Sequence, residues 1–124
     1  MARVGVRYIV HDTEAAIAFY TKHFGFEVEL HPMPGFAALV RGDLFLMLNQ
    51  PGAGGAGKTM ADGTSPEPGG WNRFQLEVDD LDATIDALRS EGCTFRSEVI
   101  HGGGGKQILA LDPSGNLIEI YQGR

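Results

Sequence analysis

The chain carries one sequence plan twice. Residues 8–26 (YIVHDTEAAIAFYTKHFGF) and residues 76–95 (LEVDDLDATIDALRSEGCTF) each read as an apolar strand, an acidic residue and an amphipathic segment. Four residues of the first copy recur 68 positions later, namely Val10 as Val78, Asp12 as Asp80, Ala15 as Ala83 and Ile17 as Ile85. Such an internal repeat indicates two copies of one supersecondary unit that share a fold, because a unit of about 60 residues buries little apolar surface alone.

Each copy predicts one amphipathic helix after its first strand. The helix starts are marked by side chains that accept hydrogen bonds from first-turn amides, Asp12 or Thr13 in the first copy and Asp79 or Asp80 in the second. Apolar residues then recur near helical spacing, at Ala16, Ile17, Phe19, Tyr20, Ile85, Ala87 and Leu88. Gly25 and Gly92 stand where helices commonly end.

Short strand patterns follow each helix. The first copy continues with FEVELH, FAALV and LFLMLN, and the second with TFRSEVI, KQILAL and LIEIYQ. Each copy therefore predicts a βαβββ module, and we expect a single α+β domain over residues 1–124. Module one is expected over 1–50, a linker rich in Gly and Pro over 51–70, and module two over 71–124.

The linker contains a phosphate-loop pattern that its context contradicts. Residues 52–59, GAGGAGKT, satisfy G-x-x-x-x-G-K-[ST]. That loop binds phosphate because a helix begins at its Lys-Thr pair and directs free amides at the anion. The residues that follow, MADGTSPEPGG, contain prolines and glycines through which no helix can run. We interpret the segment as a mobile flap or a connector.

Charge and composition exclude several classes of partner. The formal net charge of −6 argues against nucleic acid, which needs a basic face, and is compatible with a cationic ligand. No stretch resembles a signal peptide or reaches the roughly 20 apolar residues of a membrane span. The single cysteine, Cys93, excludes an internal disulfide, suits a reducing cytoplasm and is expected to be a buried structural thiol.

Strand alternation separates aliphatic faces from mixed faces. The aliphatic sets are expected beneath the helices and comprise Val4, Val6, Tyr8, Val10, Leu44, Leu46, Leu48, Phe74, Leu76, Val78, Ile118 and Ile120. The mixed sets carry aromatic, thioether and charged groups, at Arg7, Ile9, Phe45, Met47, Trp71, Arg73, Gln75, Glu119 and Tyr121. An aromatic-lined surface with a few polar groups is typical of small-molecule sites, so these nine residues are predicted to bind a ligand.

Two motifs add a family resemblance to this reading. The paired modules, with AIAFYTKHFGFEVEL in the first copy and DPSGNLIEIY closing the second, resemble the vicinal oxygen chelate superfamily, the glyoxalase I, bleomycin-resistance and extradiol-dioxygenase group. The resemblance covers nearly the whole chain and implies two βαβββ modules that form curved mixed sheets around a concave cleft. It implies little about activity, because this superfamily includes lyases, isomerases, dioxygenases, thiol transferases and non-catalytic drug binders.

The resemblance also places four metal-ligand positions, of which this chain keeps one. They fall at Gly5, Arg73, Met47 (or Leu46) and Glu119. Glycine offers no side chain, arginine is a permanent cation, and a lone thioether suits copper rather than zinc, nickel or iron. The histidines do not restore the set, since none is spaced to pair with another: His11, His23, His31 and His101. No metal and no cofactor are expected.

Glu119 needs a partner, because an unpaired carboxylate in a buried strand is costly. The repeat alignment places Arg73 on the same face of a neighbouring strand, which predicts an Arg73–Glu119 ion pair where relatives hold a metal. The pair is either purely structural or a donor of hydrogen bonds to a ligand. Arg7 is the better candidate for direct contact with a ligand oxygen, the alternative being an ordinary surface arginine.

The resemblance to metal-free, antibiotic-binding members of that superfamily implies a non-catalytic function. We expect a cytoplasmic homodimer that binds a hydrophobic or aromatic small molecule and confers resistance by sequestration, with no catalytic residues. The alternative is a lyase, isomerase or dioxygenase of the same superfamily that uses Glu119 as a base. That enzyme would need missing metal ligands, and pairing with Arg73 would oppose proton uptake by the carboxylate. A scaffold without any ligand is the third possibility.

Overall fold

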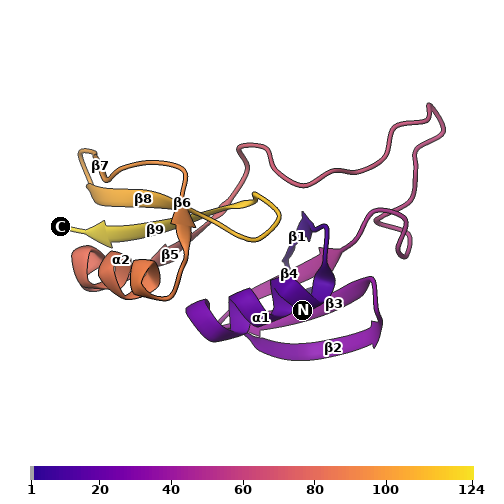
Figure 1. Ribbon diagram of the computed structural model, residues 1–124, viewed down its shortest axis with the longest axis horizontal. Helices are drawn as coiled ribbons and strands as arrows, with labels where there is room; N and C mark the ends of the chain where they lie inside the picture. The colour runs from indigo at the N-terminus through magenta and orange to yellow at the C-terminus, as the bar shows by residue number, and fades with distance from the viewer. Residues whose placement is uncertain (1) are drawn as a thin grey trace. The chain divides into compact units, whose positions relative to one another are not determined.

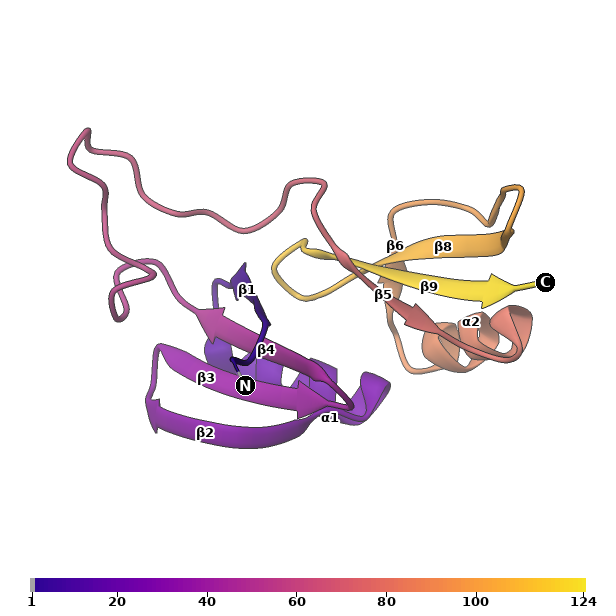
Figure 2. The same ribbon diagram turned by 180° about the vertical axis from the view of Figure 1, so that it is seen from behind.

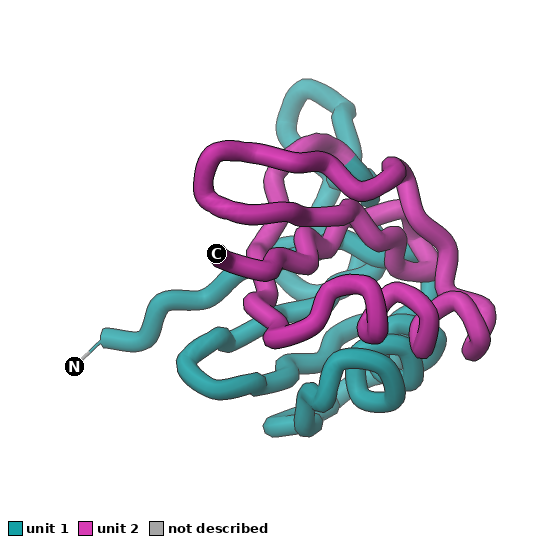
Figure 3. The backbone as a smooth tube through the Cα atoms, turned by 90° about the vertical axis from the view of Figure 1, so that its left-hand side faces the viewer, with its two compact units in different colours: residues 1–69 teal, residues 70–124 magenta. Residues whose placement is uncertain are grey.

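The structure, a computed structural model, describes residues 2–124 and divides the chain into two compact units. Unit 1 extends to Gly69 and unit 2 begins at Gly70 (Figure 3). Each unit has one α-helix and one mixed β-sheet (Figure 1). Residues 51–69 of the predicted linker group with unit 1 and Gly70 with unit 2, and the organisation of 1–124 as a single domain stays a prediction.

Unit 1 has the βαβββ order that the first sequence copy predicts. Its elements are β1 (Gly5–Ile9), α1 (Thr13–Phe24), β2 (Glu27–Met33), β3 (Phe36–Arg41) and β4 (Leu44–Asn49). The strand order in its sheet is β1-β4-β3-β2, with β1 parallel to β4 and the other pairs antiparallel. Helix α1 covers one face of this sheet (Figure 2).

Unit 2 repeats the plan with one strand divided. Its elements are β5 (Phe74–Glu77), α2 (Leu81–Ser90), β6 (Thr94–Phe95), β7 (Ile100–His101), β8 (Gly105–Leu111) and β9 (Leu117–Gly123). The strand order is β5-β9-β8-β6, with β7 also on β8 and β5 parallel to β9. The prediction of one strand over TFRSEVI is wrong, because β6 and β7 are separate short pairings with opposite ends of β8.

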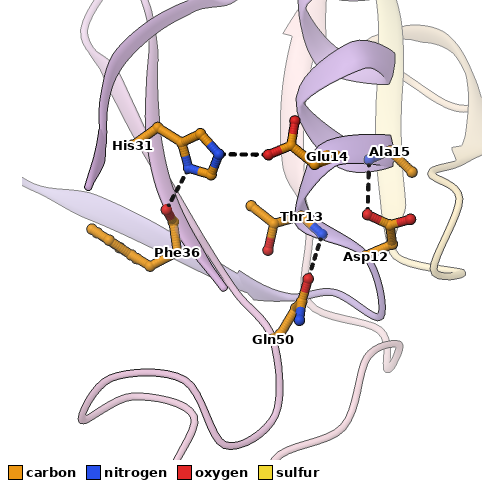
Figure 4. Close-up of polar contacts among 7 residues, drawn as sticks. All are labelled: Asp12, Thr13, Glu14, Ala15, His31, Phe36 and Gln50. Atoms are coloured by element: carbon orange, nitrogen blue, oxygen red, sulfur yellow. Dashed lines mark hydrogen bonds and ion pairs between the residues drawn. The ribbon is translucent and has the colours of Figure 1, made fainter. Parts of the chain in front are cut away.

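The repeated aspartates cap both helices, which decides between the alternatives left open by the sequence. The Asp12 carboxylate accepts from the amide of Ala15 at 3.2 Å (Figure 4), and Asp80 accepts from the amide of Ala83 at 3.0 Å. Each satisfies one of the amides that a helix leaves free in its first turn. Gly25 ends α1 in the left-handed conformation at φ 70°, which glycine adopts without strain.

A second tether to each helix start was not predicted. The side-chain carbonyl of Gln50 accepts from the amide of Thr13 at 2.9 Å, and that of Gln122 accepts from the amide of Leu81 at 2.7 Å. Gln50 directly follows β4, and Gln122 lies in β9. In both units, therefore, the last strand of the sheet holds the first turn of the helix.

The aliphatic faces form the core of each unit beneath its helix. Most of the predicted residues are at most 8% exposed, namely Tyr8, Val10, Leu46, Leu48, Phe74, Leu76, Ile118 and Ile120. Val4 is 82% exposed because β1 begins only at Gly5, so its predicted burial is wrong. Ala87 faces solvent, and Cys93 is half-buried rather than fully buried.

The segment after β4 folds into turns and not into a helix. Its first part is attached to unit 1: the amide of Gln50 donates to the carbonyl of Gly35 at 2.8 Å, and the amide of Gly57 donates to that of Ala53 at 3.0 Å. No helix begins at the Lys-Thr pair of 58–59 within the described residues, so the requirement of a phosphate loop is not met. Across residues 2–124, no helix combines the length and the apolar character needed to cross a membrane.

Candidate functional site: two arginine-bearing sheet faces

In unit 2, Glu119 receives hydrogen bonds on both of its oxygens. Arg73 donates from Nε and Nη2 to Oε1, at 3.0 and 2.9 Å, and Gln75 donates from Nε2 to Oε2 at 2.6 Å. Gln75 and Glu119 are register partners in the parallel β5–β9 pair, and Arg73 precedes β5 by one residue. The Glu119 side chain is 12% exposed and that of Arg73 is 27% exposed. The predicted ion pair is confirmed, with Gln75 as an additional donor.

Unit 1 presents a different set of groups on the matching face of its sheet. Arg7 and Met47 are register partners in the parallel β1–β4 pair. The Arg7 guanidinium donates from Nη1 to the Asn49 side-chain carbonyl in a short hydrogen bond and from Nη2 to the Met47 sulfur at 3.2 Å. Asn49 is 3% exposed, and its Nδ2 donates to the carbonyl of Ala53 at 3.2 Å. A buried amide attached to the 50–57 turn thus orients the Arg7 head group.

The donor groups on these faces do not fit a metal centre. Both oxygens of Glu119 are engaged by cationic or amide donors, and a guanidinium cannot become a ligand because it stays protonated. Gly5 is the first of the four expected ligand positions. A Cβ added there would lie 2.7 Å from the Met47 methyl carbon, so the Met47 side chain occupies the space that a ligand side chain would need. Among residues 2–124, no three His, Cys, Asp or Glu side chains gather as a metal site requires.

Phe45 has an arginine neighbour, Arg3, that is not among the nine predicted ligand-binding residues. The guanidinium carbon of Arg3 lies 4.2 Å from the centre of the Phe45 ring. The same Arg3 donates from Nη1 and Nη2 to the two oxygens of Glu29, at 2.8 and 2.9 Å. These hydrogen bonds hold the pKa of Glu29 below its usual range. One face of the Phe45 ring is therefore occupied by an arginine whose charge is already balanced.

Trp71 lies outside the strand in which it was expected. Since β5 begins at Phe74, Trp71 stands in a bend before it, and the residue is 63% exposed. The Arg96 guanidinium carbon lies 4.7 Å from the indole ring, a cation–π distance. The Trp71 carbonyl also accepts from Arg73 Nη1 at 3.3 Å. Arg96 was missed because no periodic pattern relates it to Trp71.

Tyr121 and Ile9 occupy the ends of the two mixed faces. The half-buried Tyr121 is the register partner of Glu77 and donates from its hydroxyl to the carbonyl of Gly104 at 2.7 Å. Ile9 is half-buried and is the register partner of Asn49. The structure thus groups Arg7, Ile9, Phe45 and Met47 in unit 1, and Trp71, Arg73, Gln75, Glu119 and Tyr121 in unit 2. That these residues bind a ligand stays a prediction.

His31, which the sequence does not pair with any other histidine, is the centre of a polar cluster in unit 1. Its Nδ1 lies 2.8 Å from the carbonyl of Phe36, and its Nε2 lies 2.6 Å from a carboxylate oxygen of Glu14 (Figure 4). Both neighbours are acceptors, so both ring nitrogens donate only in the imidazolium form. The Phe36 carbonyl first, and Glu14 second, raise the pKa of His31 above its ordinary value. The cluster ties the β2–β3 hairpin to the first turn of α1.

Comparison with known proteins gives one family and a set of distant structural neighbours. The family model described as the Glyoxalase/Bleomycin resistance protein/Dioxygenase superfamily matches residues 3–120. Comparison with curated proteins returns no significant match.

Three crystal structures illustrate the range of the neighbours. Lactoylglutathione lyase from Agrobacterium tumefaciens is 23% identical with a TM-score of 0.75, and the match covers 98% of this chain and 93% of that chain. TioX from Micromonospora sp. ML1 is 19% identical with a TM-score of 0.76 and full coverage of both chains. TnmS3 from Streptomyces sp. CB03234, described as an antibiotic binding protein, is 23% identical with a TM-score of 0.72 and coverage of 100% and 97%. At these identities the likeness establishes the fold.

Proposed function

The chain belongs to the glyoxalase/bleomycin resistance protein/dioxygenase superfamily, and we propose that it is a non-catalytic member that binds a hydrophobic or aromatic small molecule. The observation that carries the proposal is the state of Glu119, the one carboxylate at a position where relatives are expected to hold a metal. Its two oxygens accept from Gln75 and Arg73, and the adjacent guanidinium opposes both the approach of a metal cation and the uptake of a proton from a substrate.

The side chains near these polar groups suit the binding of an apolar ligand. Phe45, Met47 and Ile9 are half-buried, which leaves apolar surface on the Arg7 face of unit 1. In unit 2, Trp71 is largely exposed, and exposed tryptophan is a common contact residue for ligands with aromatic rings. Oriented polar groups beside such surfaces provide selectivity, and no proton-transfer group is required for binding.

An antibiotic is our proposed class of ligand, and resistance by sequestration is the proposed role. Support comes from the likeness to TnmS3, described as an antibiotic binding protein, together with the occupied carboxylate. The cytoplasmic location, the homodimer and the concave cleft expected from the sequence belong to the same proposal. The alternative is a glyoxalase-like enzyme, which the likeness to lactoylglutathione lyase favours.

The two functions separate in a ligand screen combined with assays of turnover. Purified protein would be heated with enediyne, quinone and glycopeptide antibiotics, while quenching of the single tryptophan, Trp71, gives a second signal. The proposal predicts a raised Tm and saturable quenching with at least one compound. It also predicts no turnover of methylglyoxal hemithioacetal or of a catechol. Turnover of either substrate, lost in Glu119→Gln, would establish the enzyme instead.

A further inference from the structure

The arginines on the two mixed faces differ in how their charge is balanced. Arg3 donates to both oxygens of Glu29, and Arg73 donates twice to Glu119. Arg7 lies between Asn49 and Met47, which are both uncharged. Within residues 2–124, no carboxylate contacts the Arg7 guanidinium. Among Arg3, Arg7 and Arg73, Arg7 is thus the one whose positive charge no carboxylate of residues 2–124 balances.

The internal repeat explains why this charge is unbalanced. The register pair Arg7–Met47 of β1–β4 corresponds to the pair Gln75–Glu119 of β5–β9. In unit 2 the second residue of the pair is the carboxylate Glu119, which forms an ion pair with Arg73. In unit 1 a thioether stands at the equivalent position beside the arginine. Arg7 itself stands at the position of Gln75, and Gly5 at that of Arg73, so unit 1 has an arginine beside this position and no carboxylate there to pair with it.

Arg7 also retains donors for a partner. A guanidinium has five N–H groups, and the contacts to Asn49 and Met47 use one on each terminal nitrogen. The head group is held in one orientation by Asn49, which is itself buried and attached to Ala53. A fixed planar fork of this kind matches the two oxygens of a carboxylate.

We propose that the ligand carries an ionised oxygen acid, such as a carboxylate, and that Arg7 receives it. The inference rests on the proposed binding function and specifies the class of ligand. The acid oxygens would take the place that Glu119 takes in unit 2, beside the apolar surface of Phe45 and Met47. A charge-assisted hydrogen bond is roughly twice as strong as a neutral one, so the acid form of an aromatic ligand binds more tightly than a neutral analogue.

This inference opposes what the overall charge suggests. A net charge of −6 favours cationic ligands at long range. At physiological ionic strength, however, exposed charges are screened over about 8 Å. The affinity for a ligand in contact with Arg7 therefore depends on that guanidinium more than on distant carboxylates. The preference for an acid is therefore local, and moderate salt reduces the net repulsion from the rest of the chain.

The test compares two probes of nearly the same shape, one an anion and the other a neutral amide. Naphthalene-2-carboxylate and naphthalene-2-carboxamide would be titrated into the full chain by calorimetry at pH 7 in about 0.15 M salt. We expect the carboxylate to bind roughly tenfold more tightly, which corresponds to about 1.4 kcal/mol. Arg7→Gln removes the cation, and Met47→Glu supplies the anion that unit 2 has at this position. Either variant is expected to bring the affinity ratio close to about one.

Two further variants control for folding and for charge in general. Arg7→Lys keeps the charge without the fork and is expected to retain part of the preference. Arg41→Gln removes an exposed cation at the end of β3, where its register partner is Leu44 of the aliphatic face, and is expected to leave the ratio unchanged. Equal binding of the two probes, or a preference that survives Arg7→Gln, contradicts the inference and leaves the binding function standing. If neither probe binds the folded protein, the inference is wrong, and the antibiotic screen alone decides the binding function.

Discussion

Arg73 and Glu119 form an ion pair in which one carboxylate oxygen accepts from two guanidinium nitrogens, at 3.0 and 2.9 Å. The two residues are 46 positions apart and meet because β5 and β9 run side by side in parallel. Gln75 takes the other oxygen. The engagement of both carboxylate oxygens is the physical basis on which we propose a binding function without catalysis.

Removing Arg73 is expected to destabilise unit 2. In Arg73→Ala the 12% exposed carboxylate of Glu119 keeps Gln75 as its hydrogen-bond donor but loses its cation. A partly buried group that loses its partner costs about 1–3 kcal/mol in the free energy of unfolding. Urea denaturation measures this loss. Glu119→Gln in the Arg73→Ala background should recover part of it, because the uncompensated charge is gone. A single Arg73→Ala variant with unchanged stability and ligand affinity would show that the pair has no role.

The two glutamine tethers are expected to contribute equally to the two helices. Gln50→Ala and Gln122→Ala each remove an acceptor from a first-turn amide, of Thr13 or Leu81. Each change is expected to lower the free energy of unfolding by about 0.5–1.5 kcal/mol. Hydrogen exchange of the amide at the affected helix start should accelerate in the variant. Gln107→Ala on β8 provides a matched control, and equal losses in all three variants would argue against specific tethers.

The 50–57 turn is expected to tolerate a methyl group at one glycine and not at another. At Gly57 an added Cβ would collide with the backbone carbonyl of Gln50 and stand 2.6 Å from that of Ala53, and backbone atoms cannot move aside locally. At Gly55 an added Cβ meets nothing within 4 Å. Gly57→Ala should cost about 1–3 kcal/mol, and Gly55→Ala should be close to neutral.

The same pair of variants tests the connection from this turn to Arg7. The Ala53 carbonyl holds Asn49, and Asn49 orients Arg7. Gly57→Ala should therefore reduce the preference for naphthalene-2-carboxylate, whereas Gly55→Ala should not. Thermal unfolding and the probe titration together measure both effects. Identical behaviour of the two alanine variants would mean that the turn does not support the arginine.

His31 predicts a pH dependence of stability with a definite sign. Its pKa is raised in the folded chain by the Phe36 carbonyl and by Glu14, so the folded state holds the proton more tightly than the unfolded state. The resulting stabilisation is complete below the ordinary value near 6.5 and is lost as the pH rises through the folded-state pKa. Its size is modest, because the side chain is 28% exposed and water screens the pair.

The measurement is the free energy of unfolding between pH 5.5 and 8.5 for the natural chain and for His31→Gln. The difference between the two should be largest at low pH and should shrink as the pH rises. Glu14→Gln, which removes the negative charge of one of the two acceptors around His31, should weaken the same trend. A constant difference for His31→Gln across the range would show that the imidazolium form is not what stabilises the cluster.

The sequence was sufficient to predict the features of the structure that follow from the internal repeat and from the alternation of residues along strands. The repeat predicted both βαβββ units, and the aspartate positions predicted the helix starts at Asp12 and Asp80. Strand alternation combined with the repeat brought Arg73 and Glu119 together. These relationships follow from backbone geometry, because a residue's face and register are determined by its position along a strand.

The remaining contacts depend on how far individual side chains reach, which periodicity does not encode. Arg96 stacks on Trp71 from a loop, and Arg3 spans Phe45 and Glu29. Strands β6 and β7 are separate because they pair with different residues, at opposite ends of β8. Alternation was extended too far at both strand starts, which is why Val4 and Trp71 were placed wrongly.

The metal content of the purified protein tests the central claim most directly. Elemental analysis after incubation with zinc, nickel, iron or manganese and removal of excess ion should find far less than one ion per chain, because Glu119 is held by Arg73 and Gln75. Glu119→Ala should leave that low content unchanged. One ion per chain in the natural protein, lost in Glu119→Ala, would contradict the account and indicate a metalloenzyme.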